Sequence, residues 1–232
     1  MINTKEPILE VEELTIKYQT DSGPLPAVSN ASFQVEDGEY FGLVGESGCG
    51  KSTLVKSIMG ALDDNGHITS GKIRYKGKEI QNYSEEELNK EIRWNEISYI
   101  PQSSMNSLDP LQRVSQQAIK IAQVHTEMTE EEAIARFEEV FEVVGLQKSR
   151  IHDYPHQFSG VMQQRAIIAL GLFLDPSLII ADEPTTALDV LMQDQIFKYL
   201  DSLREEFDTS MIMITHDISL IFETCERMSI MH

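Results

Sequence analysis

The sequence predicts an α/β fold with a mainly parallel sheet, an N-terminal antiparallel β part and an inserted α-helical part. In the second half, buried-strand patterns at Leu178–Ala181 and Met211–Thr215 are followed by helical patterns at Val190–Glu206 and Ile218–Cys225. Strands that alternate with helices are typical of a parallel sheet with crossover helices. We therefore expect the strands of this half to run parallel.

The first half has the patterns of further strands. Apolar residues alternate with polar ones at the end of segment 8–20, as in a half-buried strand. Two strand-like segments, 31–35 and 39–44, flank a turn at 36–38, and residues 71–80 have the pattern of a hairpin. These strands predict the antiparallel part of the fold.

Capping boxes mark the start of two helices. Ser84-Glu-Glu-Glu87 predicts a helix that runs towards Trp94, and Thr129-Glu-Glu-Glu132 predicts one that ends near Gly145. The second helix lies in a helical stretch over 107–172, which follows an expected strand at 97–100. We expect one domain over 1–232, in which 107–172 forms a helical subdomain and 1–106 and 173–232 form the core.

Composition excludes several classes of protein. The chain has 232 residues with 19 Lys and Arg against 38 Asp and Glu, and its net charge is −19. This excess of acids disfavours binding to nucleic acid or docking on an anionic lipid surface, because both depend on clustered basic residues. The longest uncharged apolar run, 166–174, is far shorter than the roughly 20 residues of a membrane helix. Two cysteines cannot form a disulfide framework, which favours a reducing compartment.

A glycine-rich segment between an expected strand and an expected helix has the pattern of a phosphate-binding loop. Gly45-Glu-Ser-Gly-Cys-Gly-Lys51-Ser52 fits G-x-x-x-x-G-K-[ST], and the alternative is a merely flexible turn. Backbone N–H groups of such a loop surround phosphates at a helix N-terminus. Lys51 would neutralise the β- and γ-phosphates, and Ser52 would bind Mg²⁺. The expected nucleotide-binding residues of this P-loop NTPase core are Gly45, Glu46, Ser47, Gly48, Cys49, Gly50, Lys51, Ser52 and Thr53.

Two adjacent acids follow the apolar run Leu178–Ala181. A buried parallel strand places such acids at the open edge of the sheet, where ligands bind. Asp182 would hold Mg²⁺ and Glu183 would polarise the attacking water. The alternative is a helix-capping acid pair before Pro184.

Two further polar residues follow expected strands. Gln102 has an amide that is suited to contact both a metal and a water. His216 could reach a γ-phosphate from the end of the strand at 211–215. Either residue, considered alone, is more often an ordinary loop residue.

The order of the motifs resembles the ATP-binding subunit of ABC transporters. Phe158-Ser-Gly-Val-Met162 resembles the L-S-G-G-Q signature of that family, and Thr185-Thr-Ala-Leu-Asp189 resembles its A-L-D loop. With the phosphate loop, Gln102, the acid pair and His216, six motifs occur in the family's order over almost the whole chain. The resemblance implies an ATPase that uses ATP and Mg²⁺.

A finer resemblance concerns the transported substrate. The segments Pro101–Pro110 and Tyr154–Gly160 look like those of the subfamily that energises oligopeptide, dipeptide or nickel importers. Such proteins usually continue beyond the position of His232, so a C-terminal extension is expected. Two rival functions remain: a soluble ABC-type ATPase that acts on nucleic acid or the ribosome, and a regulatory module that binds ATP without turnover.

The resemblance also implies partners and further site residues. Tyr18 would stack on adenine, although its position equally suits an ordinary strand aromatic. In a head-to-tail dimer, each ATP would lie between the phosphate loop of one subunit and Ser159, Gly160 and Val161 of the other, and Asp189 would couple the two sites. The helical subdomain would dock transmembrane permease subunits at the cytoplasmic side of the membrane.

Val161 departs from the family signature, which has a second glycine at this position. Valine keeps the backbone N–H but adds a branched side chain where the partner's γ-phosphate must approach. Loss of that contact would cost about 1.5–3 kcal/mol, or roughly ten- to a hundredfold in rate or affinity. This predicts a heterodimer with a sister ATPase, unless a small backbone shift accommodates the valine.

Overall fold

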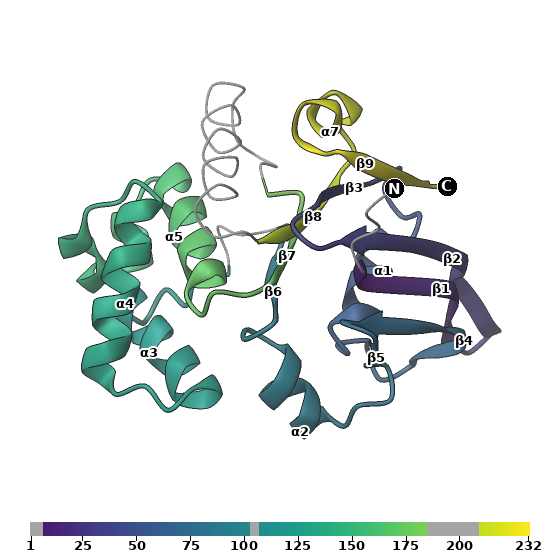
Figure 1. Ribbon diagram of the computed structural model, residues 1–232, viewed down its shortest axis with the longest axis horizontal. Coiled ribbons are helices and arrows are strands. Elements are labelled where there is room, and N and C mark those ends of the chain that lie inside the picture. The colour runs from purple at the N-terminus through teal and green to yellow at the C-terminus, as the bar shows by residue number, and fades with distance from the viewer. Residues whose placement is uncertain (1–6, 103–106, 185–208) are drawn as a thin grey trace, which may run out of the picture. The chain divides into compact units, whose positions relative to one another are not determined.

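The computed structural model describes residues 7–102, 107–184 and 209–232 (Figure 1). The chain divides into two compact units, the first formed by 1–93 with 209–232 and the second by 94–208. The predicted helix at Val190–Glu206 lies outside the described residues. Among the helices that the structure does describe, none has the length and apolar character needed to cross a membrane.

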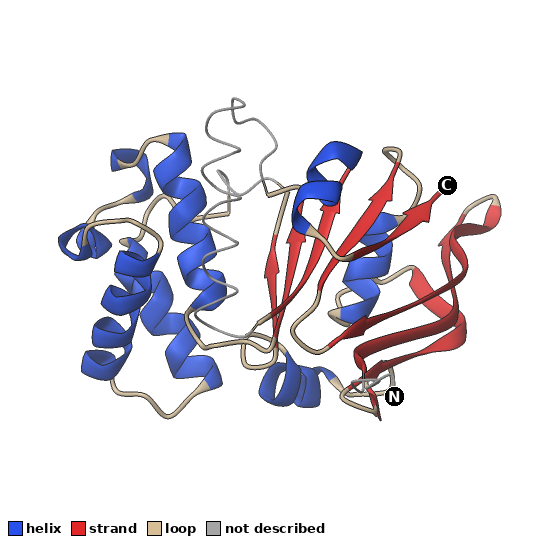
Figure 2. Cartoon of the chain, turned by 45° about the horizontal axis from the view of Figure 1, so that its top comes forward, coloured by secondary structure: helices blue, strands red, loops and turns tan. Residues whose placement is uncertain are grey.

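An antiparallel sheet forms one layer of the first unit (Figure 1, Figure 2). Its four strands occur in the order β2-β1-β4-β5, and the long pair β1–β2 runs antiparallel throughout. The predicted hairpin is confirmed, with its turn at Lys76 and Gly77, both in the left-handed backbone region. The strands are β1 (Pro7–Thr20), β2 (Gly23–Glu36), β4 (Gly66–Tyr75) and β5 (Lys78–Glu79).

Parallel strands form the other sheet layer of the first unit. β3 (Tyr40–Gly45) pairs in parallel with β8 (Ser210–Thr215) on one side and β9 (Arg227–Met231) on the other. β3 and β8 are almost wholly buried, as the continuous apolar patterns of parallel strands predict. The segments predicted around the turn at 36–38 are therefore both strands, but they belong to different sheets.

Short helices complete the described part of the first unit. α1 (Lys51–Ile58) follows β3, and α7 (Ile218–Thr224) packs on the parallel strands through the buried Ile221. The capping box at Ser84 is confirmed, but α2 (Glu85–Glu87) is a single turn that continues as a π-helical turn, η1 (Leu88–Ile92). The Arg93 guanidinium then donates to the carbonyls of Met59 and Gly60, so that it satisfies carbonyls at the end of α1.

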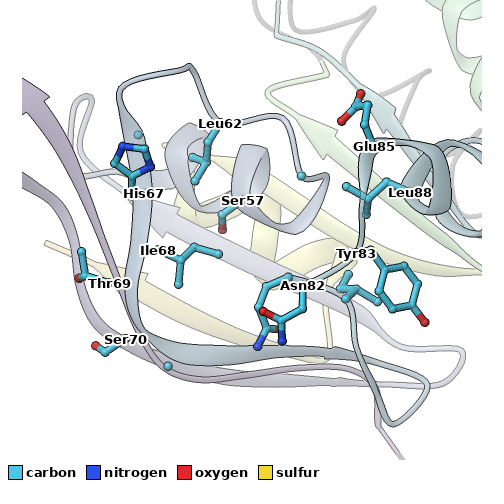
Figure 3. Close-up of a pocket in the computed structure, with 15 residues that line it drawn as sticks. Ser57, Leu62, His67, Ile68, Thr69, Ser70, Asn82, Tyr83, Glu85 and Leu88 are labelled. Carbon is cyan, nitrogen blue, oxygen red and sulfur yellow. The ribbon is translucent and has the colours of Figure 1, made fainter.

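A cavity of about 550 Å³ lies beside α1 in this unit (Figure 3). Ser57 of α1, Ile68 of β4 and Leu88 of η1 contribute to its wall, together with Asn82 and Tyr83 (Figure 3). Its lining residues include none of the predicted nucleotide-binding residues. This cavity is therefore distinct from the predicted site.

The second unit combines a strand pair with a group of helices. β6 (Ile97–Ile100) and β7 (Leu178–Asp182) run parallel. Its described helices are α3 (Val114–His125), α4 (Glu130–Val143), η3 (Lys148–His152), η4 (Pro155–Gln157) and α5 (Gly160–Leu172). Helix α4 contacts α3, η3 and α5, and α5 packs on β6.

Buried aromatic rings form the core of the helical part. Phe137 and Phe141 of α4 lie 5.2 Å apart between ring centroids, and Phe173 meets Phe137 edge to face at 5.5 Å. The capping box at Thr129 is confirmed, and the chain leaves α4 through Gly145 at a φ of 69°. The contacts thus group β6 and β7 with the helices, whereas the subdomain boundaries at 107 and 172 stay a prediction.

Candidate nucleotide-binding site

The phosphate-loop sequence forms a tight turn between β3 and α1. Gly50, the N-cap of α1, has a φ of 99°, and a Cβ atom there would lie 2.2 Å from the carbonyl oxygen of Ala27. A Cβ atom on Gly45 would lie 2.6 Å from the Cys49 sulfur. Side chains at these positions would collide with the backbone or with the loop itself. The glycines therefore let the loop close on itself at the helix N-terminus, as an anion-binding loop requires.

Lys51 is held inside this loop. Its side chain is only 7% exposed, and its ammonium donates to the carbonyl oxygens of Gly45 at 2.6 Å and Glu46 at 2.9 Å. The Cys49 sulfur lies 3.7 Å from the same nitrogen. The loop thus surrounds one fixed positive charge, the feature that would neutralise a phosphate chain.

The other loop residues lie at the surface. Glu46, Ser47 and Gly48 are exposed, and Ser52 is exposed on the first turn of α1 beside the half-buried Thr53. These positions agree with the predicted contacts to phosphate and Mg²⁺, which stay a prediction.

His216 lies at the same sheet edge as the phosphate loop. β8 pairs in parallel with β3 up to Val44 and Thr215, so the next residues along the two strands are Gly45 and His216. His216 is exposed, and the following Asp217 caps α7 by accepting the N–H of Ser219 at 2.9 Å. The histidine is therefore held between a buried strand and a capped helix.

Tyr18 lies on β1 opposite Gly66 of β4, and its ring covers that glycine. The phenol donates to the Asp63 carboxylate at 3.4 Å, and Asp63 forms an ion pair with Lys56 of α1 at 3.1 Å. Contacts thus connect the half-exposed ring to the helix that begins at the phosphate loop. Stacking of this ring on a base stays a prediction.

The predicted acids lie together in the second unit, at the end of β7. Asp182 is only 4% exposed, and its carboxylate accepts the Tyr99 phenol at 3.0 Å. Burial, and then the charge and hydrogen bond of Asp182, raise the pKa of Tyr99 well above its ordinary value of 10, so the phenol stays a donor at neutral pH. The sequence pattern did not identify Tyr99 as a site residue. Its one signal was a phenol in the short strand that precedes the expected site residue Gln102.

Gln102 and Glu183 meet directly. The Gln102 amide donates to the Glu183 carboxylate at 2.7 Å, which the parallel register of β6 and β7 makes possible. Glu183 has a φ of 47°, a left-handed conformation that is uncommon for a residue with a side chain. Such backbone strain often occurs at functional positions. Both predicted catalytic residues of this unit therefore lie in one hydrogen-bonded pair.

The signature segment begins a helix, as predicted. Ser159 is the N-cap of α5 and accepts the N–H of Met162 at 3.4 Å, while Gly160 and Val161 occupy the first turn. The preceding Phe158 is buried beneath the Arg150 guanidinium, 4.7 Å from its ring centroid. Val161 is half-buried, so part of its side chain meets solvent at the helix N-terminus. Asp189 lies outside the described residues.

The family comparison supports the resemblance to ABC transporters. A family model described as ABC transporter matches residues 28–186. The dipeptide transport ATP-binding protein of Lactococcus lactis subsp. cremoris is 41% identical over 98% of this chain and 66% of that protein. The oligopeptide transport ATP-binding protein of Escherichia coli K12 is 41% identical over 97% of this chain and 67% of that protein. The chain spans about two thirds of the length of these relatives.

A solved structure shares the fold. It is a dimeric ATP-binding cassette in a post-hydrolysis state bound to ADP and Pi. Its TM-score is 0.83 with 29% identity, and the match covers 96% of this chain and 94% of that chain.

Proposed function

Because this chain belongs to the ABC transporter family, we propose that it binds and hydrolyses ATP to power a peptide importer. The loop that closes around the Lys51 ammonium is the observation that carries the proposal. The substrate class is supported by the relatives, which are named as dipeptide and oligopeptide transport proteins. These names favour peptides over nickel and favour transport over an action on nucleic acid.

The residues present fit a nucleotide and its metal. The glycine loop leaves space that a Cβ atom would fill, and it surrounds the Lys51 charge. Hydroxyl, amide and carboxylate oxygens of Ser52, Gln102 and Asp182 are the donors that Mg²⁺ prefers. When bound, Mg²⁺ would neutralise negative charge on the phosphates.

Each side chain would have a separate task in hydrolysis. Lys51 would hold the β- and γ-phosphates, and Tyr18 would support the base. Glu183 would accept a proton from the attacking water, while Gln102 keeps its carboxylate in place. His216 would contact the γ-phosphate from the sheet edge that it shares with the phosphate loop.

The chain would act in a head-to-tail dimer with transmembrane permease subunits, on the cytoplasmic side of the membrane. A dimeric structural neighbour that holds ADP and Pi supports the dimer. In this arrangement the first turn of α5 would face the partner's ATP, with Asp189 coupling the two sites. Val161 would weaken that contact, which favours a heterodimer in which only the site opposite this signature is impaired.

The Val161 proposal has a direct test in the assembled transporter. Val161→Gly should raise ATP turnover roughly tenfold or more if the valine removes a charge-assisted hydrogen bond. Lys78→Ala, at an exposed residue of β5 outside the signature segment, is the control that should leave turnover unchanged. An unchanged rate for Val161→Gly would show that a backbone shift accommodates the valine.

Nucleotide binding tests the function itself. We expect the purified chain to bind trinitrophenyl-ATP, and Lys51→Ala to weaken binding at least about tenfold, as loss of a charge-assisted contact predicts. Lys120→Ala, which replaces an exposed lysine of α3, is the control that should bind normally.

Single-turnover hydrolysis separates an ATPase from a regulatory module. Glu183→Gln should bind ATP but not hydrolyse it, whereas a purely regulatory module would show no turnover with either glutamate or glutamine at this position. A wild-type chain indifferent to nucleotide would refute the proposal.

A further inference from the structure

Tyr99 and Asp182 lie on one face of the β6–β7 pair. The register places Tyr99 opposite Ile180, and Asp182 follows Ile180 by two residues. Side chains two residues apart on a strand point to the same face. The Tyr99 phenol therefore reaches along the neighbouring strand to the carboxylate, where it donates at 3.0 Å.

This hydrogen bond matters because the Asp182 carboxylate that accepts it is buried. Asp182 is 4% exposed, so water has little access to its carboxylate. A buried carboxylate is stabilised by donors from the protein, and a donor on one oxygen limits rotation of the whole planar group.

We propose that Tyr99 is a positioning residue, which holds the carboxylate of Asp182 in the orientation that a Mg²⁺-nucleotide complex requires. The inference rests on the proposed function, because it assumes that Asp182 acts towards the metal. Groups that orient metal-binding side chains typically contribute 10- to 100-fold in metal affinity or activity. Tyr99 would thus affect the metal-dependent part of ATP binding and leave the metal-independent part unaltered.

The test compares nucleotide affinity with and without metal. Trinitrophenyl-ATP is titrated into the full chain in EDTA and again in Mg²⁺, and the ratio of the two dissociation constants is the readout. Tyr99→Phe keeps the ring and removes only the hydroxyl. We expect it to keep its affinity in EDTA and to lose about tenfold or more of the Mg²⁺-dependent gain. In hydrolysis, half-saturation by Mg²⁺ should rise by a similar factor while the rate at saturating Mg²⁺ changes little.

Ser98→Ala is the matched control on the same strand. The Ser98 hydroxyl is buried and has no hydrogen-bond partner in the described structure, so its loss should leave the Mg²⁺ dependence unchanged. An equal Mg²⁺ gain in Tyr99→Phe and wild type would overturn the inference. A lowered melting temperature with an unaltered ratio would also overturn it, because that is the result of a structural role. A wild-type chain that binds no nucleotide would remove the proposed function and this inference together.

Discussion

Gly50→Ala should destabilise the protein more than the same substitution at another left-handed glycine. Gly50 has a φ of 99°, and an added Cβ atom would lie 2.2 Å from the Ala27 carbonyl oxygen. Gly77, in the β4–β5 turn, has a φ of 76°, and an added Cβ atom there would meet nothing within 4 Å. Both substitutions carry a backbone cost of about 1–2 kcal/mol. Gly50→Ala adds an overpacking cost of about 1–3 kcal/mol, because a backbone atom of β2 must move.

Thermal unfolding distinguishes the overpacking cost of Gly50→Ala from the backbone cost that both substitutions share. For a chain of this size, about 1 kcal/mol shifts the melting temperature by about 2–4 °C. Gly77→Ala should therefore lower it by about 4–5 °C, and Gly50→Ala by about 10 °C. Gly50→Ala should also lose affinity for trinitrophenyl-ATP, because the first turn of α1 must shift, while Gly77→Ala should bind normally. Equal melting temperatures for the two variants would refute the steric reasoning.

Three further predictions concern other parts of the chain. Thr129→Ala should lower the free energy of unfolding by about 1 kcal/mol in urea titrations, because it removes the N-cap of α4; an unchanged midpoint would contradict this. The backbone N–H and then the hydroxyl of Thr129 hold the pKa of Glu132 below its ordinary value of 4.5. That stabilisation is complete above pH 4.5 and is lost as pH falls through the lowered value, so Glu132→Gln should reduce stability at pH 7 and flatten its acid decline. Tyr18→Phe should retain nucleotide affinity and Tyr18→Ala should lose roughly tenfold, whereas equal binding by both would exclude stacking.

Local patterns predicted most of the elements but not how they are grouped. The capping boxes at Ser84 and Thr129 and the turn at Lys76 depend on a few neighbouring residues, so sequence identifies them well. The helix after Ser84 was expected to reach Trp94 as one regular element. Instead it changes to a π-helical turn before Arg93, whose guanidinium binds carbonyls about 33 residues earlier in the chain. Such a long-range contact leaves no periodic signal.

In the candidate site, too, local motifs could be predicted from the sequence and long-range contacts could not. The phosphate loop and the acid pair could be predicted because their chemistry requires fixed residue types at fixed spacing. Tyr99 could not be predicted, because its role depends on the register between two strands that are about 80 residues apart in the chain. The Gln102–Glu183 hydrogen bond depends on the same register. Sequence therefore identified the charged groups and missed the group that holds one of them in place.

Lys51 and Glu183 each have a hydrogen-bond partner within their own unit. Lys51 donates to two loop carbonyls, so an incoming phosphate must compete with neutral acceptors. The bonds to the carbonyls are already charge-assisted because the ammonium is ionised, but a phosphate adds its own negative charge, so its attraction to Lys51 is stronger than that of a neutral carbonyl. The Gln102 amide donates one hydrogen bond to the Glu183 carboxylate. A carboxylate has about four acceptor positions, and this hydrogen bond occupies one of them. In the proposed mechanism this contact would therefore orient Glu183 without preventing it from accepting a proton. Lys51 would exchange its carbonyl acceptors for phosphate oxygens when a nucleotide binds, whereas the Glu183 carboxylate is already oriented, and preorganised groups contribute most to catalysis.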